Sequence, residues 1–222
     1  MRSLILSTLT ISFLLLKLLP LHAQEQTEGL FSTDQVLKID LSFDFKELLK
    51  NKHKEEYVEA DFEANFADGN QIAERIRIRA RGNLRKSYCN FPPIKLNFKG
   101  KEKGSSKFLG QKKLKLVTPC KGSKIFQQYV YGEYLAYKMF NLVSDLSFRV
   151  RLVELRYIDK SGKRKPMEFS GFLIEDVDDM AARNDCREME VSKFSQRLVE
   201  HDYMAKVSLF QYAIGNTDWK IE

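Results

Sequence analysis

The sequence predicts an α+β chain, in which an antiparallel-sheet N-terminal lobe precedes an incomplete helical C-terminal lobe. Short segments that alternate apolar and polar residues, a pattern typical of half-buried strands, recur from residue 36 to residue 117 and again from 150 to 174. The chain after residue 176 instead has helical periodicity, most clearly over residues 202–214. These two observations place the lobe boundary near residue 176.

The composition indicates one folded domain over residues 35–222, with its N-terminal lobe at about 35–176 and a partial C-terminal lobe at about 177–222. Hydrophobic residues make up 43% of the 222 residues, which is typical of a globule with a core. The net charge of +7 makes an anionic partner plausible. This excess is mild, so a nucleic-acid partner is not expected. The sequence does not indicate an oligomeric state.

Residues 1–23 have the pattern of a signal peptide. Arg2 precedes an apolar run from Leu4 to Leu16, and cleavage is expected after Ala23. An uncleaved membrane anchor is the alternative, because the apolar stretch nearly reaches spanning length if Lys17 snorkels. The predicted localisation is therefore periplasmic or extracellular.

The segment that follows, residues 24–34, is polar and lacks periodicity, so it is expected to be a flexible leader. The chain contains Cys89, Cys120 and Cys186. After export one pair could form a disulfide and leave one thiol; three free thiols are the alternative. The cysteine spacings fit no metal-site pattern.

The first strong strand signal is a hairpin over residues 58–81. Its first strand carries a row of acids and its second carries Arg75, Arg77, Arg79 and Arg81. Any register that puts both apolar sets on one face also sets the acids opposite the arginines, and such pairs favour pairing by a few tenths of a kcal/mol each. We assign Arg75 and Arg77 to this role, since the other two lie nearer the turn that follows.

The remaining elements follow from the same two periodicities. The acidic run at 175–179 is expected to start a helix or to form the rim of a ligand cleft. Further strands are expected at 36–42, 94–98, 113–117, 150–158 and 167–174, and helices at 45–54, 127–141, from 192 onward and at 202–214.

Two features in the first lobe could hold a phosphate. Arg81, Gly82 and Asn83 form a basic turn that could present guanidinium and backbone N–H groups to an anion, although an exposed basic turn is the alternative. Lys95 and Lys115 lie on predicted strands, where a lysine is either a solvated rim residue or faces a cleft.

A third feature follows the last predicted helix. Gly215 and Asn216 precede Asp218, and an aspartate braced by an asparagine in a short loop suits a general base or a metal-facing carboxylate. An ordinary helix end is the alternative, with Gly215 as the C-terminal cap.

The order of these motifs resembles the CotH kinase-like family of secreted or spore-coat atypical kinases. The motifs are Arg79–Asn83, Pro92–Phe98, a helix, Gly171–Asp178 and Asn216–Asp218, and the resemblance covers roughly residues 70–222. It implies a two-lobed, atypical protein-kinase-like fold related to HipA-like enzymes. It also implies ATP and Mg²⁺ as cofactors, with phosphoryl transfer to a protein or another hydroxyl acceptor.

The resemblance also implies site residues in the first lobe. Arg81, Gly82 and Asn83 match a loop over the nucleotide. Lys95 matches a strand lysine that contacts the ATP phosphates, and Lys115 competes with it for that role.

Further roles come from the same resemblance. Glu133 is a candidate helix partner for the strand lysine, and Glu175 matches an acid near the edge of the adenine. Asp218 matches the catalytic-loop aspartate that orients the acceptor hydroxyl, and Asn216 supports that loop.

The chain departs from the family pattern at two points. The second glycine of the nucleotide loop is replaced, and Leu84 stands where a small hydroxyl residue is usual. Only four residues follow Asp218, so the carboxylate that would hold Mg²⁺ is missing unless Glu222 or a partner supplies it. We therefore expect a truncated, inactive kinase-like chain; a non-catalytic envelope protein that binds an anionic partner through basic loops is the alternative.

Overall fold

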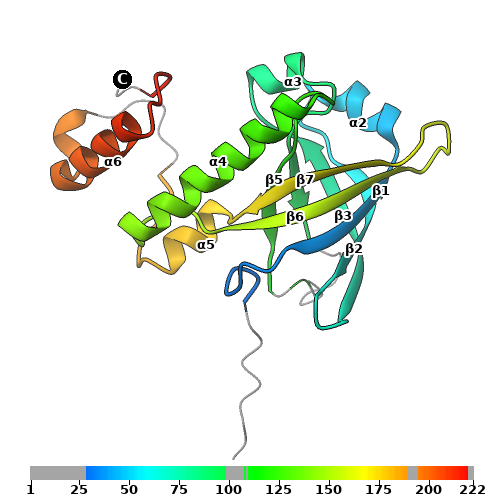
Figure 1. Ribbon diagram of the computed structural model, residues 1–222, viewed down its shortest axis with the longest axis horizontal. Helices are drawn as coiled ribbons and strands as arrows, with labels where there is room; N and C mark the ends of the chain where they lie inside the picture. The colour runs from blue at the N-terminus through cyan, green and yellow to red at the C-terminus, as the bar shows by residue number, and fades with distance from the viewer. Residues whose placement is uncertain (1–28, 99–107, 109, 190–194, 220–222) are drawn as a thin grey trace, which may run out of the picture.

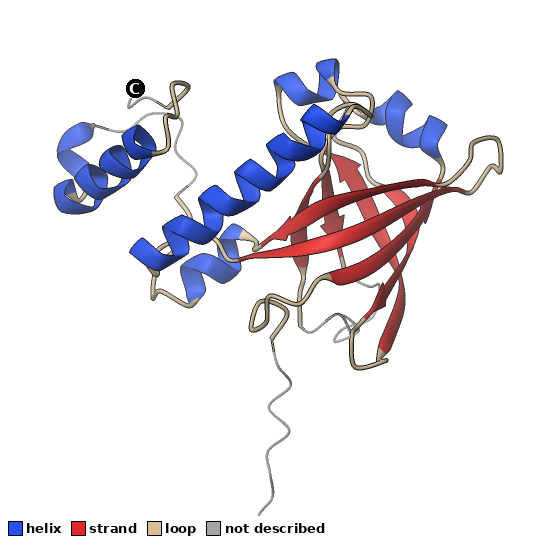
Figure 2. Cartoon of the chain, in the orientation of Figure 1, coloured by secondary structure: helices blue, strands red, loops and turns tan. Residues whose placement is uncertain are grey.

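Seven strands form a closed barrel with helices on its outside (Figures 1 and 2). The computed structural model describes residues 29–98, 108, 110–189 and 195–219. The order around the barrel is β1-β2-β3-β4-β5-β7-β6. The strands are β1 (Leu37–Phe43), β2 (Val58–Asn65), β3 (Gln71–Ala80), β4 (Ile94–Asn97), β5 (Lys113–Val117), β6 (Val150–Asp159) and β7 (Met167–Ile174).

The barrel is closed by the first strand and a strand from the second half of the chain. β1 pairs with β6 in parallel, with Leu37 opposite Val153 and Phe43 opposite Asp159, whereas every other strand pair is antiparallel. The predicted antiparallel-sheet lobe of a kinase-like fold is therefore wrong. Alternation in a sequence identifies the buried face of a strand but not its partner, so a pairing between distant segments leaves no local signal.

The predicted helical C-terminal lobe is also wrong for the described residues. The longest helix, α4, runs along the outside of the barrel, and α6 stands apart from the barrel with no buried residue (Figure 1). α6 touches α4 through the rings of Phe140 and Phe210, whose centroids are 4.9 Å apart. The helices are α2 (Phe45–Asn51), α3 (Leu84–Tyr88), α4 (Lys124–Val143), α5 (Val177–Ala182) and α6 (His201–Ala213), with a 3₁₀ turn at Gln196–Leu198.

The inward-facing side chains of the strands fill the barrel. At one end, the rings of Phe62, Phe98 and Phe108 pack with centroids 4.8–5.1 Å apart. Phe43 and Tyr157 belong to a second aromatic group in the same core, with centroids 5.2 Å apart. The described side chains therefore form a packed core inside the barrel.

The predicted hairpin is confirmed. β2 and β3 pair so that Asp61 lies opposite Arg75 and Glu59 opposite Arg77, and the first of these pairs is 3.5 Å apart. Arg79 instead reaches out of the hairpin, and its Nη1 lies 2.5 Å from Glu55. The arginine row is thus used in part to hold the hairpin together.

The structure describes the chain from Gly29 onward, so the predicted signal peptide at residues 1–23 lies outside the described residues. Leu30 is buried, and the guanidinium of Arg151 donates to the carbonyl oxygens of Leu30 and Gln35. The end of the predicted flexible leader is thus packed against the barrel. Ser192, the predicted start of a helix, is outside the described residues. Of the helices in the described part of the chain, none has the length and apolar character needed to cross a membrane.

We expect Gly171→Ala to lower the free energy of unfolding by about 2 kcal/mol, because the site has no space for a methyl group. A Cβ at Gly171 would lie 2.6 Å from the carbonyl oxygen of Val117 and 2.9 Å from Leu155 Cδ1. Urea denaturation measures the effect. The matched control is Gly132→Ala on the exposed side of α4, where the methyl meets nothing within 4 Å and helix propensity favours alanine. A Gly171→Ala protein as stable as the control would contradict the clash.

Candidate functional site

Basic side chains from three neighbouring strands meet on the outer face of the barrel. Ile94 and Leu96 point into the core, so Lys95 between them points outward, and Lys115 on β5 does the same. In the β4–β5 register, Lys95 and Lys115 lie directly opposite each other. Arg81 follows β3, and its backbone N–H donates to the carbonyl oxygen of Pro93, which precedes β4. The sequence-predicted phosphate residues are therefore brought together.

Two of these cations, Lys115 and Arg81, have a lowered pKa in this partly buried environment. Burial lowers the pKa of Lys115, and the nearby charges of Arg81 and Lys95 lower it as well. Burial also lowers the pKa of Arg81. Like charges held together out of water destabilise each other, so this cluster favours a bound anion.

Asp176 is the carboxylate most enclosed by the cluster. It is 3% exposed, and its Oδ2 lies 3.7 Å from Lys95 Nζ without a hydrogen-bond partner among the described residues. Its Oδ1 accepts from the backbone N–H of Asp178 and so caps α5. The sequence places this residue in an acidic run expected to start a helix, but its contact with Lys95 was not predicted.

Glu133 approaches the cluster from α4. Its Oε2 lies 3.6 Å from Arg85 Nη1, and burial raises its pKa although Arg85 and Arg81 act to lower it. The predicted Lys95–Glu133 pair is thus replaced by Lys95–Asp176 and Arg85–Glu133. The cluster therefore contains four cations and three carboxylates. The cations are Arg81, Arg85, Lys95 and Lys115, and the carboxylates are Glu133, Asp176 and the exposed Glu188.

The glycine of the basic turn adopts a left-handed backbone conformation. Gly82 has φ +87°, which favours glycine, and Asn83 precedes α3 without a side-chain capping bond. Two other cations of this region share one acid, since Glu55 binds both Arg79 and Lys86. Hydrogen bonds from Lys86 and Arg79 lower the pKa of Glu55 to about 2. Among Arg81, Gly82 and Asn83 of the basic turn, Arg81 is therefore the residue whose side chain belongs to the cluster.

Glu175 lies in a separate ion-pair network. It is 1% exposed, and its carboxylate accepts hydrogen bonds from the guanidinium groups of Arg149 and Arg183 at 2.6–3.2 Å. Burial acts to raise its pKa, but the hydrogen bonds from Arg183 and Arg149 outweigh burial and hold the pKa below its usual range. These contacts give Glu175 a structural role where β7 meets α5.

Asn216 and Asp218 lie in an exposed turn after α6. The Asn216 Oδ1 accepts from the Asp218 backbone N–H at 3.1 Å, and Gly215 has φ +67° at the end of the helix. No hydrogen bond or ion pair of the described residues joins this turn to the basic cluster. The geometry matches the helix-end alternative, and the structure does not bring the predicted catalytic pair to Lys95.

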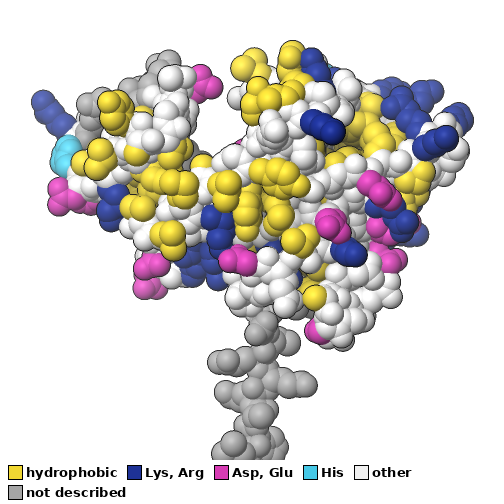
Figure 3. Space-filling view, in the orientation of Figure 1, with side chains coloured by type: hydrophobic (Ala, Val, Ile, Leu, Met, Phe, Trp, Pro, Cys, Tyr) yellow, Lys and Arg dark blue, Asp and Glu magenta, His cyan; other side chains and the backbone are white. Residues whose placement is uncertain are grey.

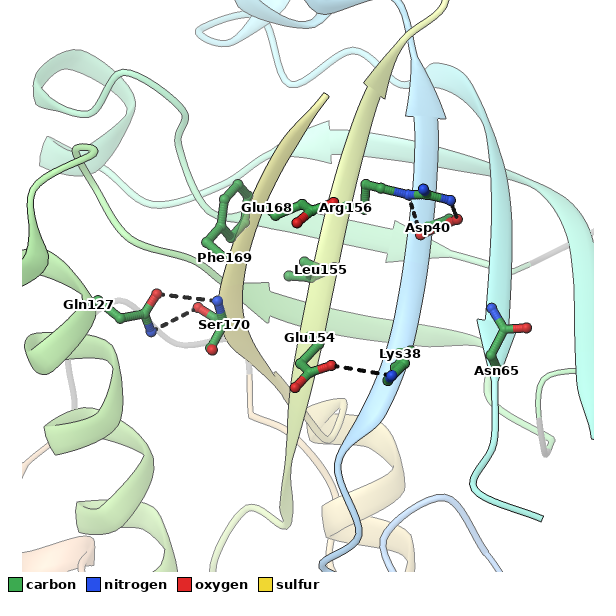
Figure 4. Close-up of a pocket in the computed structure, with 10 residues that line it drawn as sticks. All are labelled: Lys38, Asp40, Asn65, Gln127, Glu154, Leu155, Arg156, Glu168, Phe169 and Ser170. Carbon is green, nitrogen blue, oxygen red and sulfur yellow. Dashed lines mark hydrogen bonds and ion pairs between the residues drawn. The ribbon is translucent and has the colours of Figure 1, made fainter. Parts of the chain in front are cut away.

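A broad open concavity of about 680 Å³ lies elsewhere on the barrel, over β1, β6 and β7 (Figure 4). Four of its five charged side chains are paired, since Lys38 Nζ lies 3.9 Å from Glu154 and Arg156 binds Asp40; Glu168 makes no ion pair within the described ranges. Gln127 of α4 exchanges two hydrogen bonds with the backbone of Ser170 at its border. Because most of these groups satisfy one another, the concavity is a weaker site than the basic cluster.

The fold and site define a closed mixed β-barrel with a partly buried basic cluster on its outer face. Comparisons of the chain with protein-family models, with curated proteins and with solved structures find no match. The disulfide left open by the sequence joins Cys89 and Cys120, and Cys186 is an exposed free thiol.

Proposed function

We propose that this chain binds the phosphate groups of a nucleotide at the basic cluster, and that ATP is the ligand to test first. The observation that carries the proposal is the direct cross-strand placement of Lys95 and Lys115. Like charges in this position destabilise a sheet. Asp176 offsets part of the repulsion, and a bound anion would offset more of it.

The chemistry of the other groups supports a phosphate more than a carboxylate ligand. Arg81 supplies a planar fork that can hold two phosphate oxygens, and each lysine supplies a point charge. The Lys115 ammonium lies over the ring of Phe148, with Nζ 4.6 Å from the ring centroid, so an aromatic side chain borders the cluster. An extended polyanion with one apolar end fits this arrangement.

Phosphoryl transfer to a hydroxyl acceptor is the reaction that the resemblance implies, but the residues fit only part of it. Lys95, Lys115 and Arg81 suit the phosphates of ATP. Within the described ranges no group of three His, Cys, Asp or Glu side chains is placed to hold a metal ion, so any Mg²⁺ here would depend on the nucleotide phosphates for most of its ligands. We therefore propose nucleotide binding for this chain and keep phosphoryl transfer as a property of the family it resembles.

Isothermal titration of ATP, with and without Mg²⁺, tests the proposal. We expect each of Lys95→Ala and Lys115→Ala to weaken binding by about ten-fold, because each removes a charge-assisted contact. Lys163→Ala, in the exposed β6–β7 turn, is the matched control and should bind as the parent does.

Two results would count against nucleotide binding. A folded parent protein that takes up no ATP would overturn it directly. Inorganic polyphosphate that binds as tightly as ATP, and is lost with added salt, would favour the alternative of an envelope protein that holds an anionic polymer.

A further inference from the structure

A second cavity lies beside the disulfide and shares no residue with the basic cluster. Its volume is about 430 Å³, within the range of small-molecule sites. Three segments surround it: residues 90–91 before β4, residues 119–124 leading into α4 together with Gln127 of that helix, and residues 167–169 of β7.

The floor of this cavity is apolar and belongs to the main core. Phe91 is 8% exposed, and its ring packs against Phe45 at 5.0 Å and Tyr157 at 6.0 Å. The partly buried Met167 and Phe169 pack on the same core from β7. A ligand that buries an alkyl or aromatic body here gains hydrophobic contact with side chains that are already fixed.

The walls are held in place before any ligand arrives. The Cys89–Cys120 disulfide joins two of the surrounding segments, and Asn90 N–H donates to the Cys120 carbonyl oxygen at 3.0 Å. Gln127 is fixed by its two hydrogen bonds to the Ser170 backbone. Preorganised walls reduce the entropy lost on binding.

The rim gives the cavity a charge preference. Lys121 and Lys124 line it against the single carboxylate of Glu168. Neither lysine takes part in an ion pair within the described ranges, and the Lys121 ammonium lies 3.8 Å from the centre of the Tyr88 ring. A ligand with an anionic head therefore meets two cations whose charges are not already neutralised.

We propose that this cavity binds an organic anion with an alkyl or aromatic body. The anionic head of the ligand lies near Lys121 and Lys124, and its body packs against Phe91 and Met167. The site is independent of the nucleotide proposal, because the two share no residue.

Fluorescence titration with 1-anilinonaphthalene-8-sulfonate, and its displacement by decanoate, tests this site. Lys121→Glu with Lys124→Glu is expected to weaken both ligands by at least about ten-fold. The matched pair Lys163→Glu with Lys165→Glu, on the exposed β6–β7 turn, makes the same change of net charge and leaves binding within about two-fold. Decanol, which lacks the charge, binds more weakly than decanoate.

A separate control addresses apolar surface elsewhere. Hydrophobic side chains gather over α4 and α6 (Figure 3), and Leu142 there is 90% exposed. Leu142→Gln leaves dye binding unchanged if the dye occupies the cavity, and Met167→Gln weakens it.

Equal binding by the Lys121/Lys124 variant and the parent, or loss of binding in Leu142→Gln, overturns the proposal. Tighter binding of decanoate identifies a lipid-type anion, and tighter binding of the dye identifies an aromatic one; either supports the site.

Discussion

Replacing Glu175 with glutamine should lower the free energy of unfolding by about 2–3 kcal/mol. The change leaves Arg149 and Arg183 without their shared carboxylate at a position where Glu175 is 1% exposed. Breaking a fully buried pair costs about 3–5 kcal/mol, and we reduce this because both arginines are partly exposed to water. Urea denaturation at pH 7 measures the loss.

The control is Glu154→Gln, which removes an exposed carboxylate 3.9 Å from Lys38 and should change stability by less than about 0.5 kcal/mol. The pH dependence gives a second check. Because the folded protein lowers the pKa of Glu175, its contribution is present above the ordinary glutamate pKa and is lost as the pH falls through the lowered one. The difference between the parent and Glu175→Gln should therefore shrink in acid; a constant difference would assign the loss to altered packing.

Removing the Cys89–Cys120 disulfide should cost about 4 kcal/mol of stability. The two cysteines are 31 residues apart in sequence, and a cross-link of this length restricts the unfolded chain by about this amount. The bond also joins the end of α3 to the loop that begins α4. The measurement is the urea midpoint of the Cys89→Ala, Cys120→Ala double variant against the parent protein.

Cys186→Ser is the matched control, because this thiol is exposed and unpaired. It should leave the midpoint unchanged in both the presence and the absence of a reducing agent. A double variant within about 1 kcal/mol of the parent would mean that the disulfide adds little to a barrel already held by its strand ladders.

The local elements could be predicted from the sequence because their patterns are local. Lys113–Val117 and Met167–Ile174 have the predicted bounds, and the β2–β3 hairpin follows from its facing acidic and basic rows. The barrel could not be predicted in this way. Its closure depends on the pairing of Leu37–Phe43 with a strand from the second half of the chain, and neither segment carries a signal for the other.

Part of the candidate site could likewise be predicted from the sequence, and part could not. Arg81, Lys95 and Lys115 come together because β3, β4 and β5 are consecutive, so neighbouring strands supply neighbouring side chains. Glu175 and Asp176 are adjacent in sequence but face different partners, which depends on the turn from β7 into α5. Asp218 lies beyond α6, whose placement no sequence pattern fixes.

The seam between β1 and β6 has a consequence for how this protein folds. Asp40 and Arg156 face each other across it although they are 116 residues apart in sequence. Contacts of such separation slow folding, because a long loop must lose its freedom before they form. Until β6 is available, one edge of β1 exposes unpaired backbone groups that can template pairing with another chain. The seam that completes the barrel is therefore also the step at which an incomplete molecule is most open to aggregation.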